Sequence, residues 1–426
     1  MTPPESGSDL TPGTREHDLV VLGATGFVGR LLAAYLAEHA PLDLRVALAG
    51  RSPERLRAVR GGLPSAASRW PMLTVDSLDE ASVGELARST RVVVTAVGPY
   101  ARLGLPLARA CAEAGTHYAD LTGEVLYVRD LVDGCHETAV GTGARIVTSC
   151  GFDSVPSDLG VHLLHRHAQE IGAGGLGDTT MLVTRFRGGV SGGTIDSMRT
   201  QLEALEADPT RRRVVFDPFA LSADRAAEPD GKDQREVMRV FQDDRTGQWT
   251  APFVMAPFNT RVVRRSNSLL EHAYGPRFRY REAMAFGTGA KGRGRATALT
   301  VGLGALMSAM STRATRSVAD RVLPAPGEGP DEQARAAGRF RCELRTTTDN
   351  GRRLRSVVSA HGDPGYAATS VMLGEAALSL VLDGERLRAG GGVLTPAVAM
   401  GDVLVDRLRA QGFSLTVGDD PGTSPS

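Results

Sequence analysis

The chain has 426 residues, of which 42% are hydrophobic and 23% charged, with 49 basic and 49 acidic side chains. This composition is typical of a globular protein and excludes a largely disordered chain. The length allows two domains, each with a core of its own. Because the positive and negative charges balance, no global field attracts nucleic acid, and we expect no nucleic-acid partner.

The cysteines and the first residues bear on the cellular compartment. The cysteines form no CxxC pair and are too sparse for a disulfide framework, so we expect a reducing, cytoplasmic compartment and no metal site. Residues 1–15 lack an apolar run and predict a disordered tail rather than a secretory signal. The four cysteines are Cys111, Cys135, Cys150 and Cys342.

Residues 16–155 alternate between strand and helix patterns, which predicts a Rossmann-type α/β domain with a parallel sheet. An apolar strand at 18–22 leads through a glycine-rich turn into a helix. A fully buried strand is predicted at 92–97, because this run is rich in β-branched residues and does not alternate. A helix is predicted at 104–114, with Gly115 as its C-terminal cap. The other predicted strands are 44–49, 73–75, 117–121 and 144–149, and the other predicted helices are 78–88 and 124–140.

Residues 156–362 change character and predict an inserted α+β domain with a mostly antiparallel sheet. One helix to about residue 168 comes first, and polar stretches at 208–233 and 324–333 predict long surface loops. Residues 363–426 are expected to return to the Rossmann domain as two helices, 366–382 and 396–410. The strand-like runs are 179–186, 253–263, 278–286, 340–347 and 353–359.

A glycine-rich segment lies where the first strand meets the first helix. Gly23 permits the tight turn, Gly26 lets the backbone approach a pyrophosphate, and Gly29 allows the helix to pack closely on the strand. The N-terminus of the helix offers free N–H groups to the phosphates, and Thr25 and Phe27 of the same loop are expected to contact the cofactor. The alternative is a plain tight turn.

The end of the second strand indicates which dinucleotide binds. NAD enzymes carry an acid there, whereas this chain has Arg51, whose guanidinium suits a 2′-phosphate. We therefore expect NADP(H), with Ser52 adding a hydroxyl to the same phosphate; the alternative is that Arg51 is a solvated loop cation. Gly98, Pro99 and Tyr100 follow the fourth strand, at the edge where such sheets bind ligands. Gly98 leaves room for the nicotinamide half, and Tyr100 either packs on a ligand or is structural.

Eight short motifs are spread along the chain. They are GATGFVG (23–29), AGRS (49–52), AVGPY (96–100), HYADLTGE (117–124), GFDSVPSD (151–158), SGGT (191–194), GDPGY (362–366) and GGVLTPAVAMGD (391–402). On these motifs the chain resembles the saccharopine-dehydrogenase-like oxidoreductases, in particular the branch called trans-acting enoyl reductases. The resemblance implies an NADP-binding Rossmann domain and an inserted second domain. It also implies reduction of a double bond in a small-molecule or carrier-bound acyl intermediate of lipid or glycolipid assembly, with an acyl carrier or polyketide synthase as partner.

Reduction of an enoyl thioester needs a hydride at the β-carbon, donors to the enolate oxygen and a proton for the α-carbon. Strand alternation places Tyr118 and Asp120 on one face, so that both would point toward one cleft. We consider Tyr118, assisted by Asp120, as the donor or proton source. The alternative is that Asp120, with Thr122 and Glu124, caps the following helix.

Two further segments precede predicted helices. Asp153 follows the sixth strand at the carboxyl edge of the sheet and is a candidate for contact with substrate or cofactor. Helix capping by Asp153 or Ser154 is the structural alternative. Residues 191–194 either present N–H groups to an anionic oxygen or cap a helix.

Two surface features suggest partners. Arg277, Arg279 and Arg281 alternate with Phe278 and Tyr280, so one strand face is basic. That face is either solvated or a platform for a phosphopantetheine arm or an acidic carrier. A second feature is the uncharged segment 296–312, flanked by basic residues. It predicts a buried or partly buried helix, with peripheral contact at the plasma membrane as the alternative. A homodimer is a further expectation.

Two other functions remain open on the sequence alone. A saccharopine-type dehydrogenase acts on an imine between amino acids, and its polycarboxylate substrate needs a basic pocket. Lys232 and Lys291 are the only lysines, although arginines are abundant. A non-catalytic NADP sensor would keep the glycine-rich fingerprint and lose the hydride geometry.

Overall fold

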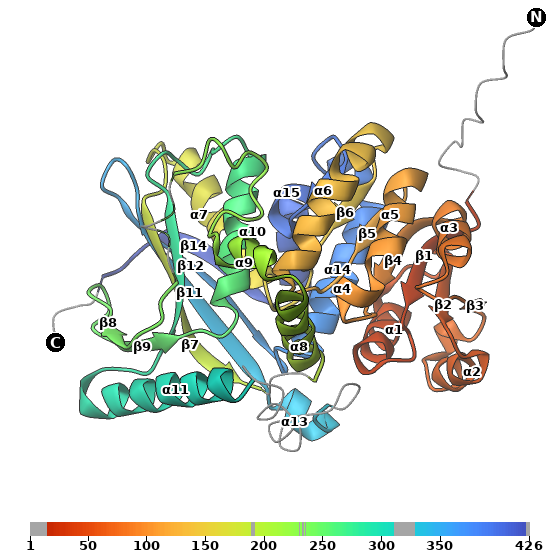
Figure 1. Ribbon diagram of the computed structural model, residues 1–426, viewed down its shortest axis with the longest axis horizontal. Coiled ribbons are helices and arrows are strands. Elements are labelled where there is room, and N and C mark those ends of the chain that lie inside the picture. Colours follow the sequence, from red (N-terminus) through yellow and green to blue (C-terminus); the bar gives the residue numbers. More distant parts are fainter. Residues whose placement is uncertain are drawn as a thin grey trace, which may run out of the picture.

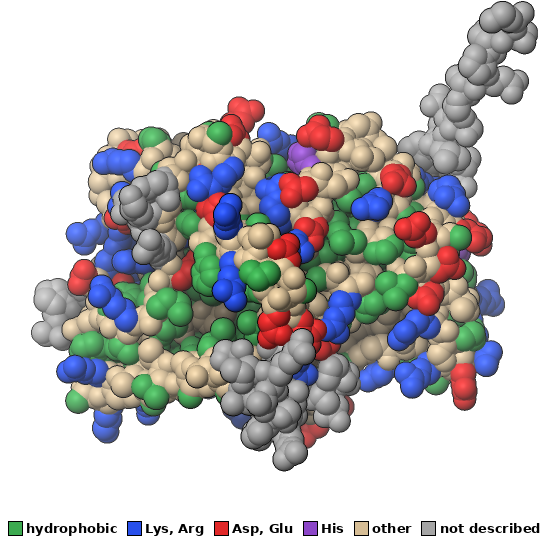
Figure 2. Space-filling model, viewed as in Figure 1, with side chains coloured by type: hydrophobic (Ala, Val, Ile, Leu, Met, Phe, Trp, Pro, Cys, Tyr) green, Lys and Arg blue, Asp and Glu red, His purple; other side chains and the backbone are tan. Residues whose placement is uncertain are grey.

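The computed structural model describes residues 15–188, 192–229, 231, 234, 236–310 and 329–422. The expected tail up to residue 14 and parts of the 191–194 motif, the 324–333 loop and the 296–312 segment therefore lie outside the described residues. The described chain forms two sheets side by side, each flanked by helices (Figure 1). Acidic and basic side chains are interspersed over the face that Figure 2 shows, without a region of a single sign.

The first sheet is parallel and has seven strands in the order β13-β6-β5-β4-β1-β2-β3. Strand β1, in the interior of this sheet, is buried at every residue, as expected for a parallel sheet covered on both faces. The strands are β1 His17–Leu22, β2 Val46–Gly50, β3 Met72–Thr74, β4 Thr90–Thr95, β5 His117–Ala119, β6 Arg145–Val147 and β13 Gly392–Leu394.

Helices cover both faces of this sheet. Helices α3, α5 and α6 pack against one another on one face, and α1 packs with the late helix α14 on the other. Gly115 ends α5 in the left-handed conformation, with φ +67°, which confirms the predicted cap. The helices are α1 Phe27–His39, α2 Pro53–Gly61, α3 Glu80–Ser89, α4 Tyr100–Leu103, α5 Leu105–Ala114, α6 Val125–Thr142 and α14 Ala367–Leu382.

The second sheet is mostly antiparallel, in the order β14-β12-β11-β7-β10-β9-β8, with β7 and β10 as its parallel pair. Helices α7 (Val155–Glu170) and α10 (Ala256–Leu269) pack on one of its faces. The predicted fold class, a Rossmann-type domain with an inserted α+β domain, is confirmed. The strands are β7 Asp178–Arg187, β8 Phe241–Gln242, β9 Trp249–Pro252, β10 Arg279–Ala285, β11 Arg339–Thr347, β12 Arg353–His361 and β14 Ser414–Asp419.

The strand predicted at 253–263 is wrong, because most of this segment belongs to helix α10. The helix buries three arginines, Arg261, Arg264 and Arg265, which donate hydrogen bonds to backbone carbonyls between residues 215 and 221. The arginines thereby hold a segment for which an open surface loop was expected. That segment contains the short helix α9 (Arg212–Phe216) and buried side chains.

The C-terminal segment returns to both sheets, whereas only helices on the Rossmann domain were expected. Strand β13 pairs with β6 of the first sheet, and β14 pairs with β12 of the second. The single helix expected at 396–410 is broken into α15 (Pro396–Ala399) and α16 (Gly401–Ala410). The break lies at Gly401, which adopts a positive φ of +43°.

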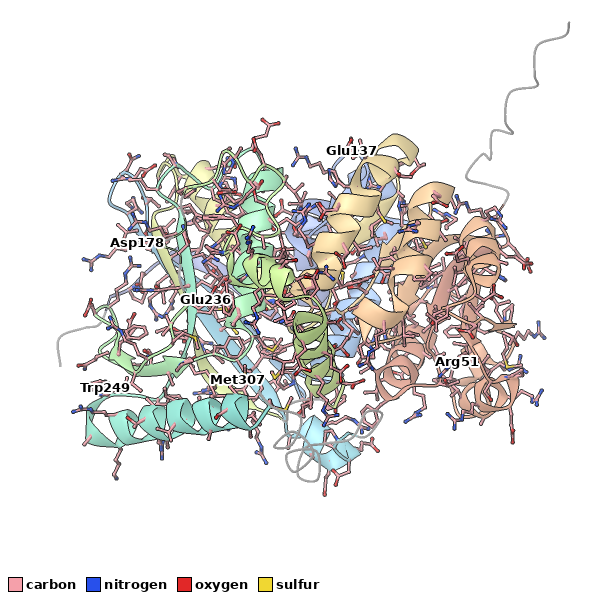
Figure 3. The ribbon with its side chains drawn as sticks, in the orientation of Figure 1. Arg51, Glu137, Asp178, Glu236, Trp249 and Met307 are labelled. Carbon is pink, nitrogen blue, oxygen red and sulfur yellow. The ribbon has the colours of Figure 1, made fainter. Side chains whose placement is uncertain are left out.

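Helix α11 (Gly289–Met310) lies along the border of the second sheet and packs against β9 (Figure 1). In Figure 3, Trp249 of β9 is labelled near one end of this helix, and Met307 of the helix itself is labelled near the other. Ala296 and Met310 are buried, while Val301 and Met307 are 66% and 48% exposed, so the helix is partly buried as expected. Within the described residues, no helix has the length and apolar character needed to cross a membrane. The remaining helices are α8 Gly192–Ala207 and α13 Glu332–Ala336.

Candidate functional site

The corner between β1 and α1 is closed so tightly that it requires glycine. Gly23 has φ +84°, and a Cβ at this position would lie 2.6 Å from Cγ2 of Val97. A Cβ on Gly29 would lie 2.0 Å from the carbonyl oxygen of Gly23, so the helix touches the turn directly. Gly26 is exposed and occupies the N-cap position, where no side chain caps the helix. The first N–H groups of α1 thus remain available to a phosphate.

Thr25 and Phe27 form the outer part of this corner. The Thr25 carbonyl accepts a hydrogen bond of 2.9 Å from Arg30, and the Thr25 side chain faces Gly50 at the end of β2. The half-buried Phe27 ring packs edge-on against Tyr366, with ring centroids 4.8 Å apart. The C-terminal part of the chain therefore supplies one wall of the corner.

The next corner, after β2, carries the two residues expected to recognise a 2′-phosphate. Arg51 is exposed, and its guanidinium has no partner among the described residues (Figure 3). Ser52 is the N-cap of α2, where its hydroxyl accepts the N–H of Arg55 at 3.3 Å. Because β2 lies beside β1 in the sheet, Arg51 neighbours the glycine corner. The residues present fit NADP, with bare backbone for the pyrophosphate and a free guanidinium for the additional phosphate.

On the other side of β1, the segment after β4 provides one open residue. Gly98 is exposed, and the Gly98–Pro99 peptide bond is cis. Pro99 is buried. The Tyr100 ring is also buried, and its hydroxyl donates to the Thr95 carbonyl at 3.1 Å. Of the two interpretations of Tyr100, the structure favours the structural one, and Gly98 is the part of this segment that a ligand can reach.

Tyr118 and Asp120 lie on the same side of their strand, as alternation predicts, but they do not face a cleft. Both are fully buried, so the expectation of an open cleft in front of them is wrong. The Tyr118 hydroxyl donates to Oδ2 of Asp120 at 2.9 Å and lies 3.0 Å from the Tyr127 hydroxyl. Oδ1 of Asp120 accepts the N–H groups of Thr122 and Ser149. Burial raises the pKa of Asp120 to about 6.

The role of Glu124 differs from the one considered on the sequence, which was to help cap the helix that follows it. It is the N-cap residue of α6, yet its carboxylate caps a different helix, α4, by accepting the N–H groups of Tyr100 and Ala101, both at 2.8 Å. Ser197 of α8 donates to the same carboxylate at 2.7 Å. The sequence signal for such a contact was only the acid within the 117–124 motif. These bonds tie the inserted domain to the Rossmann edge.

Asp153 lies in the turn between β6 and α7, at the same edge. Its side chain is half-buried, and its carboxyl has no hydrogen-bond partner among the described residues. Burial raises its pKa to about 7. Oδ2 lies 3.6 Å from the position that a Cβ on Gly123 would occupy, so the carboxyl adjoins the loop after β5. Ser154 rather than Asp153 holds the N-cap position of α7, and it makes no side-chain capping bond.

The inserted domain meets this edge through apolar side chains. The ring of Phe152 lies 5.8 Å from that of Phe186, at the end of β7. Met255, just before α10, approaches Gly123 from the same domain, and its Cε lies 3.7 Å from the point where a Cβ on that glycine would be. Asp153 is therefore placed between a polar sheet edge and an apolar wall.

The basic strand face predicted at 277–281 exists, but it lies away from this edge. Arg279 and Arg281 are exposed while Phe278 and Tyr280 are buried, which confirms the alternation. Arg277 forms an ion pair with Asp349 at 2.7 Å, and Arg281 donates to Thr180 at 2.9 Å. These guanidinium groups are thus partly satisfied within the chain.

Comparison with known proteins gives concordant results. Residues 19–143 match the model of the saccharopine dehydrogenase NADP binding domain. The chain is 50% identical over 417 residues to a provisionally named trans-acting enoyl reductase of Mycobacterium tuberculosis, covering 95% of this chain and 98% of the relative. It is 45% identical to the trans-acting enoyl reductase of Mycobacterium ulcerans, with the same coverage. Saccharopine dehydrogenase (L-Glu forming) of Saccharomyces cerevisiae matches the fold, with a TM-score of 0.52 at 13% identity over 95% of this chain and all of that one.

The fold and the matched NADP-binding domain define an NADP-dependent oxidoreductase. The extent and identity of the matches then place the chain more narrowly. It belongs to the trans-acting enoyl reductases of the saccharopine-dehydrogenase-like group.

Proposed function

We propose that the protein reduces the carbon–carbon double bond of an α,β-unsaturated acyl thioester, with Asp153 as the proton donor. The proposal is supported by the names of its relatives and carried by one observation. A half-buried carboxyl without a partner among the described residues, its pKa raised to about 7, lies at the carboxyl edge of the first sheet, beside the corners expected to hold NADPH. A donor with this pKa suits proton transfer at neutral pH.

NADPH supplies a hydride, which forms the new C–H bond at the β-carbon. The electron pair of the double bond then moves toward the thioester carbonyl, and the α-carbon takes a proton. In our proposal the Asp153 carboxyl gives up that proton and is reprotonated from solvent. The apolar wall of Phe152, Phe186 and Met255 lowers the polarity of the same place and favours the neutral form of the carboxyl.

Tyr118 and Asp120 act in this proposal as positioning residues. Their hydrogen bonds join the loop after β5 to the turn after β6, which carries both Ser149 and Asp153. Replacing Tyr118 by Phe should therefore lower the free energy of unfolding while leaving the pH dependence of turnover unchanged. Loss of turnover together with its pH dependence in Tyr118→Phe would instead make Tyr118 the proton source.

The test of the reaction itself is an assay of NADPH oxidation with a trans-2-enoyl thioester of N-acetylcysteamine. We expect oxidation with this substrate and none with glutamate plus an aldehyde, the substrate pair of a saccharopine-type enzyme. The reverse result would support that alternative. NADPH binding without oxidation of either substrate would support an NADP sensor.

A finer proposal concerns helix α11, which we infer contacts an anionic membrane surface. Its outward residues include Val301 and Met307, and its first turns carry the exposed cations Lys291, Arg293 and Arg295 without any acid within the helix. Cations beside an apolar face suit anionic headgroups. The protein should sediment with phosphatidylglycerol vesicles and not with phosphatidylcholine vesicles, and the double variant Lys291→Gln/Arg295→Gln should lose this binding. Equal sedimentation with both would refute the contact.

A further inference from the structure

A cavity of about 530 Å³ opens at the end of the second sheet that faces the Rossmann edge. Five of its lining residues are apolar, and they come from the ends of β7 and β10 and the residue that follows β10. These are Val183, Phe186, Met284, Ala285 and Phe286. Phe186 also packs against Phe152, the residue before Asp153, so this end of the sheet lies next to the site of the proposed reduction.

Three arginines, Arg185, Arg187 and Arg339, line the same cavity. All three are exposed, and none has a hydrogen-bond or ion-pair partner among the described residues. Arg187 and Arg339 lie directly opposite each other in the β7–β11 ladder, and Arg185 lies opposite Arg341. Of these four, Arg341 is neutralised by Glu343, at 2.7 Å.

Two like charges opposite each other in a ladder repel, and that repulsion costs stability unless an anion relieves it. The carboxylate of Asp363 lies near Gly188 at the end of β7, but it is buried and engaged with other groups. The three guanidiniums therefore offer forked donors to an external anion, a geometry that suits phosphate. Arg277, by contrast, lies near the opposite end of this sheet and is neutralised by an ion pair with Asp349.

We propose that Arg185, Arg187 and Arg339 bind the phosphate of a phosphopantetheine arm that carries the acyl thioester. This inference rests on the proposed function, because it identifies how that substrate is presented. The apolar lining would hold the arm and the start of the acyl chain, with the thioester directed past Phe186 toward Asp153. Coenzyme A and an acyl carrier protein both carry this phosphate, so the three arginines would recognise the group that the two carriers share.

The first experiment measures binding without turnover. Calorimetry on the full-length protein with NADPH should show 4′-phosphopantetheine binding at least about 10-fold more tightly than pantetheine. Arg187→Gln and Arg339→Gln should remove most of this preference and leave NADPH affinity unchanged. Neither variant should lower the unfolding midpoint, because each removes one of two opposed like charges. Arg277→Gln, at an exposed arginine just before β10, is the matched control and should retain the preference. Equal binding of the two compounds by the unaltered protein, or an undiminished preference in both variants, would overturn the proposal.

The second experiment distinguishes the source of the arm and separates this proposal from the first. Both variants should raise KM for enoyl-coenzyme A or for an enoyl carrier protein, whichever the protein accepts, and should leave KM for the N-acetylcysteamine thioester unchanged, because that thioester lacks the phosphate. An equal rise in KM for the N-acetylcysteamine thioester would contradict phosphate recognition. Failure to reduce any enoyl thioester would refute the proposed function alone, since the binding measurement needs no reaction.

Discussion

The Ser197 hydroxyl donates a hydrogen bond of 2.7 Å to Oε1 of Glu124, the same oxygen that accepts the N–H of Tyr100. One carboxylate therefore joins α8 of the inserted domain, the first turn of α4 and the loop after β5. Burial raises the pKa of this carboxyl, and its three donors oppose the rise. The contact fixes the inserted domain against the carboxyl edge of the first sheet.

Replacing Ser197 by Ala removes one donor to a buried carboxylate. We expect the free energy of unfolding to fall by about 1 to 2 kcal/mol, measured by urea denaturation. Ser414→Ala, on the exposed face of β14, is the control and should change it by less than about 0.5 kcal/mol. No difference between the two variants would mean that the domain contact contributes little.

Adding one methyl group at Gly29 should disrupt the cofactor corner. A Cβ there would lie 2.0 Å from the Gly23 carbonyl oxygen, so helix and turn must move apart. We expect Gly29→Ala to lose about 1 to 3 kcal/mol of stability and to bind NADPH poorly. Gly61→Ala, in α2, meets open space and should affect neither quantity. Normal NADPH affinity in Gly29→Ala would show that the corner does not hold the pyrophosphate.

Arg51 should determine the preference for NADPH. Removing its guanidinium deletes charge-assisted bonds to the 2′-phosphate, so Arg51→Ala should weaken NADPH binding by about 10- to 100-fold. NADH affinity should hardly change, because NADH lacks that phosphate. Fluorescence titration of both coenzymes is the measurement, with Arg57→Ala on the exposed side of α2 as control. A parallel loss of affinity for both coenzymes would contradict the assignment.

Asp153 should set the pH dependence of turnover. A proton donor works in its protonated form, so kcat should be highest below pH 7 and fall as the pH rises through about 7, the raised pKa of this carboxyl. Asp153→Asn should lower kcat by about 10²-fold or more and abolish this fall, with NADPH affinity preserved. If kcat of Asp153→Asn still falls as the pH rises through about 7, another group donates the proton.

Glu282 gives a stability prediction away from the cofactor. This fully buried carboxyl accepts hydrogen bonds from Asn259 and Tyr280, and burial raises its pKa to about 8. In the unfolded chain it titrates near 4.5. The folded state thus binds the extra proton between these values, and the free energy of unfolding falls as the pH rises from about 4.5 to about 8.

Glu282→Gln mimics the protonated acid and should remove this contribution. Its free energy of unfolding should fall less steeply with pH, by up to about 1.4 kcal/mol per pH unit across that range. Urea denaturation at several pH values measures the slope, with the exposed Glu54→Gln as control. An unchanged slope in Glu282→Gln would show that Glu282 titrates normally.

The Rossmann domain could be predicted because its signals are local. Gly23, Gly26 and Gly29 lie within seven residues, and the buried strands are continuous apolar runs. Helix α10 could not be recognised in this way. Its residues Arg261, Arg264 and Arg265 are buried because they donate hydrogen bonds to backbone carbonyls more than forty residues earlier in the chain.

The same limit applies to the site. Arg51 and Asp153 could be selected from the sequence, because each follows a predicted strand and ligands bind at the carboxyl ends of parallel strands. The enclosure of Tyr118 by Asp120 and Tyr127 depends on packing, and so does the capping of α4 by Glu124. Polar Ser414 and Thr416 flank apolar Leu415, an alternation that is typical of a strand. This local signal for β14 was missed, because only helices were predicted for the C-terminal segment.

The return of β13 and β14 to separate sheets has a consequence for how the protein is made. Both strands lie beyond residue 390, so a nascent chain still lacking them has an unpaired border on β6 and another on β12. Such borders invite association with other chains. Neither domain can therefore complete its sheet before residues 392–419 have been synthesised.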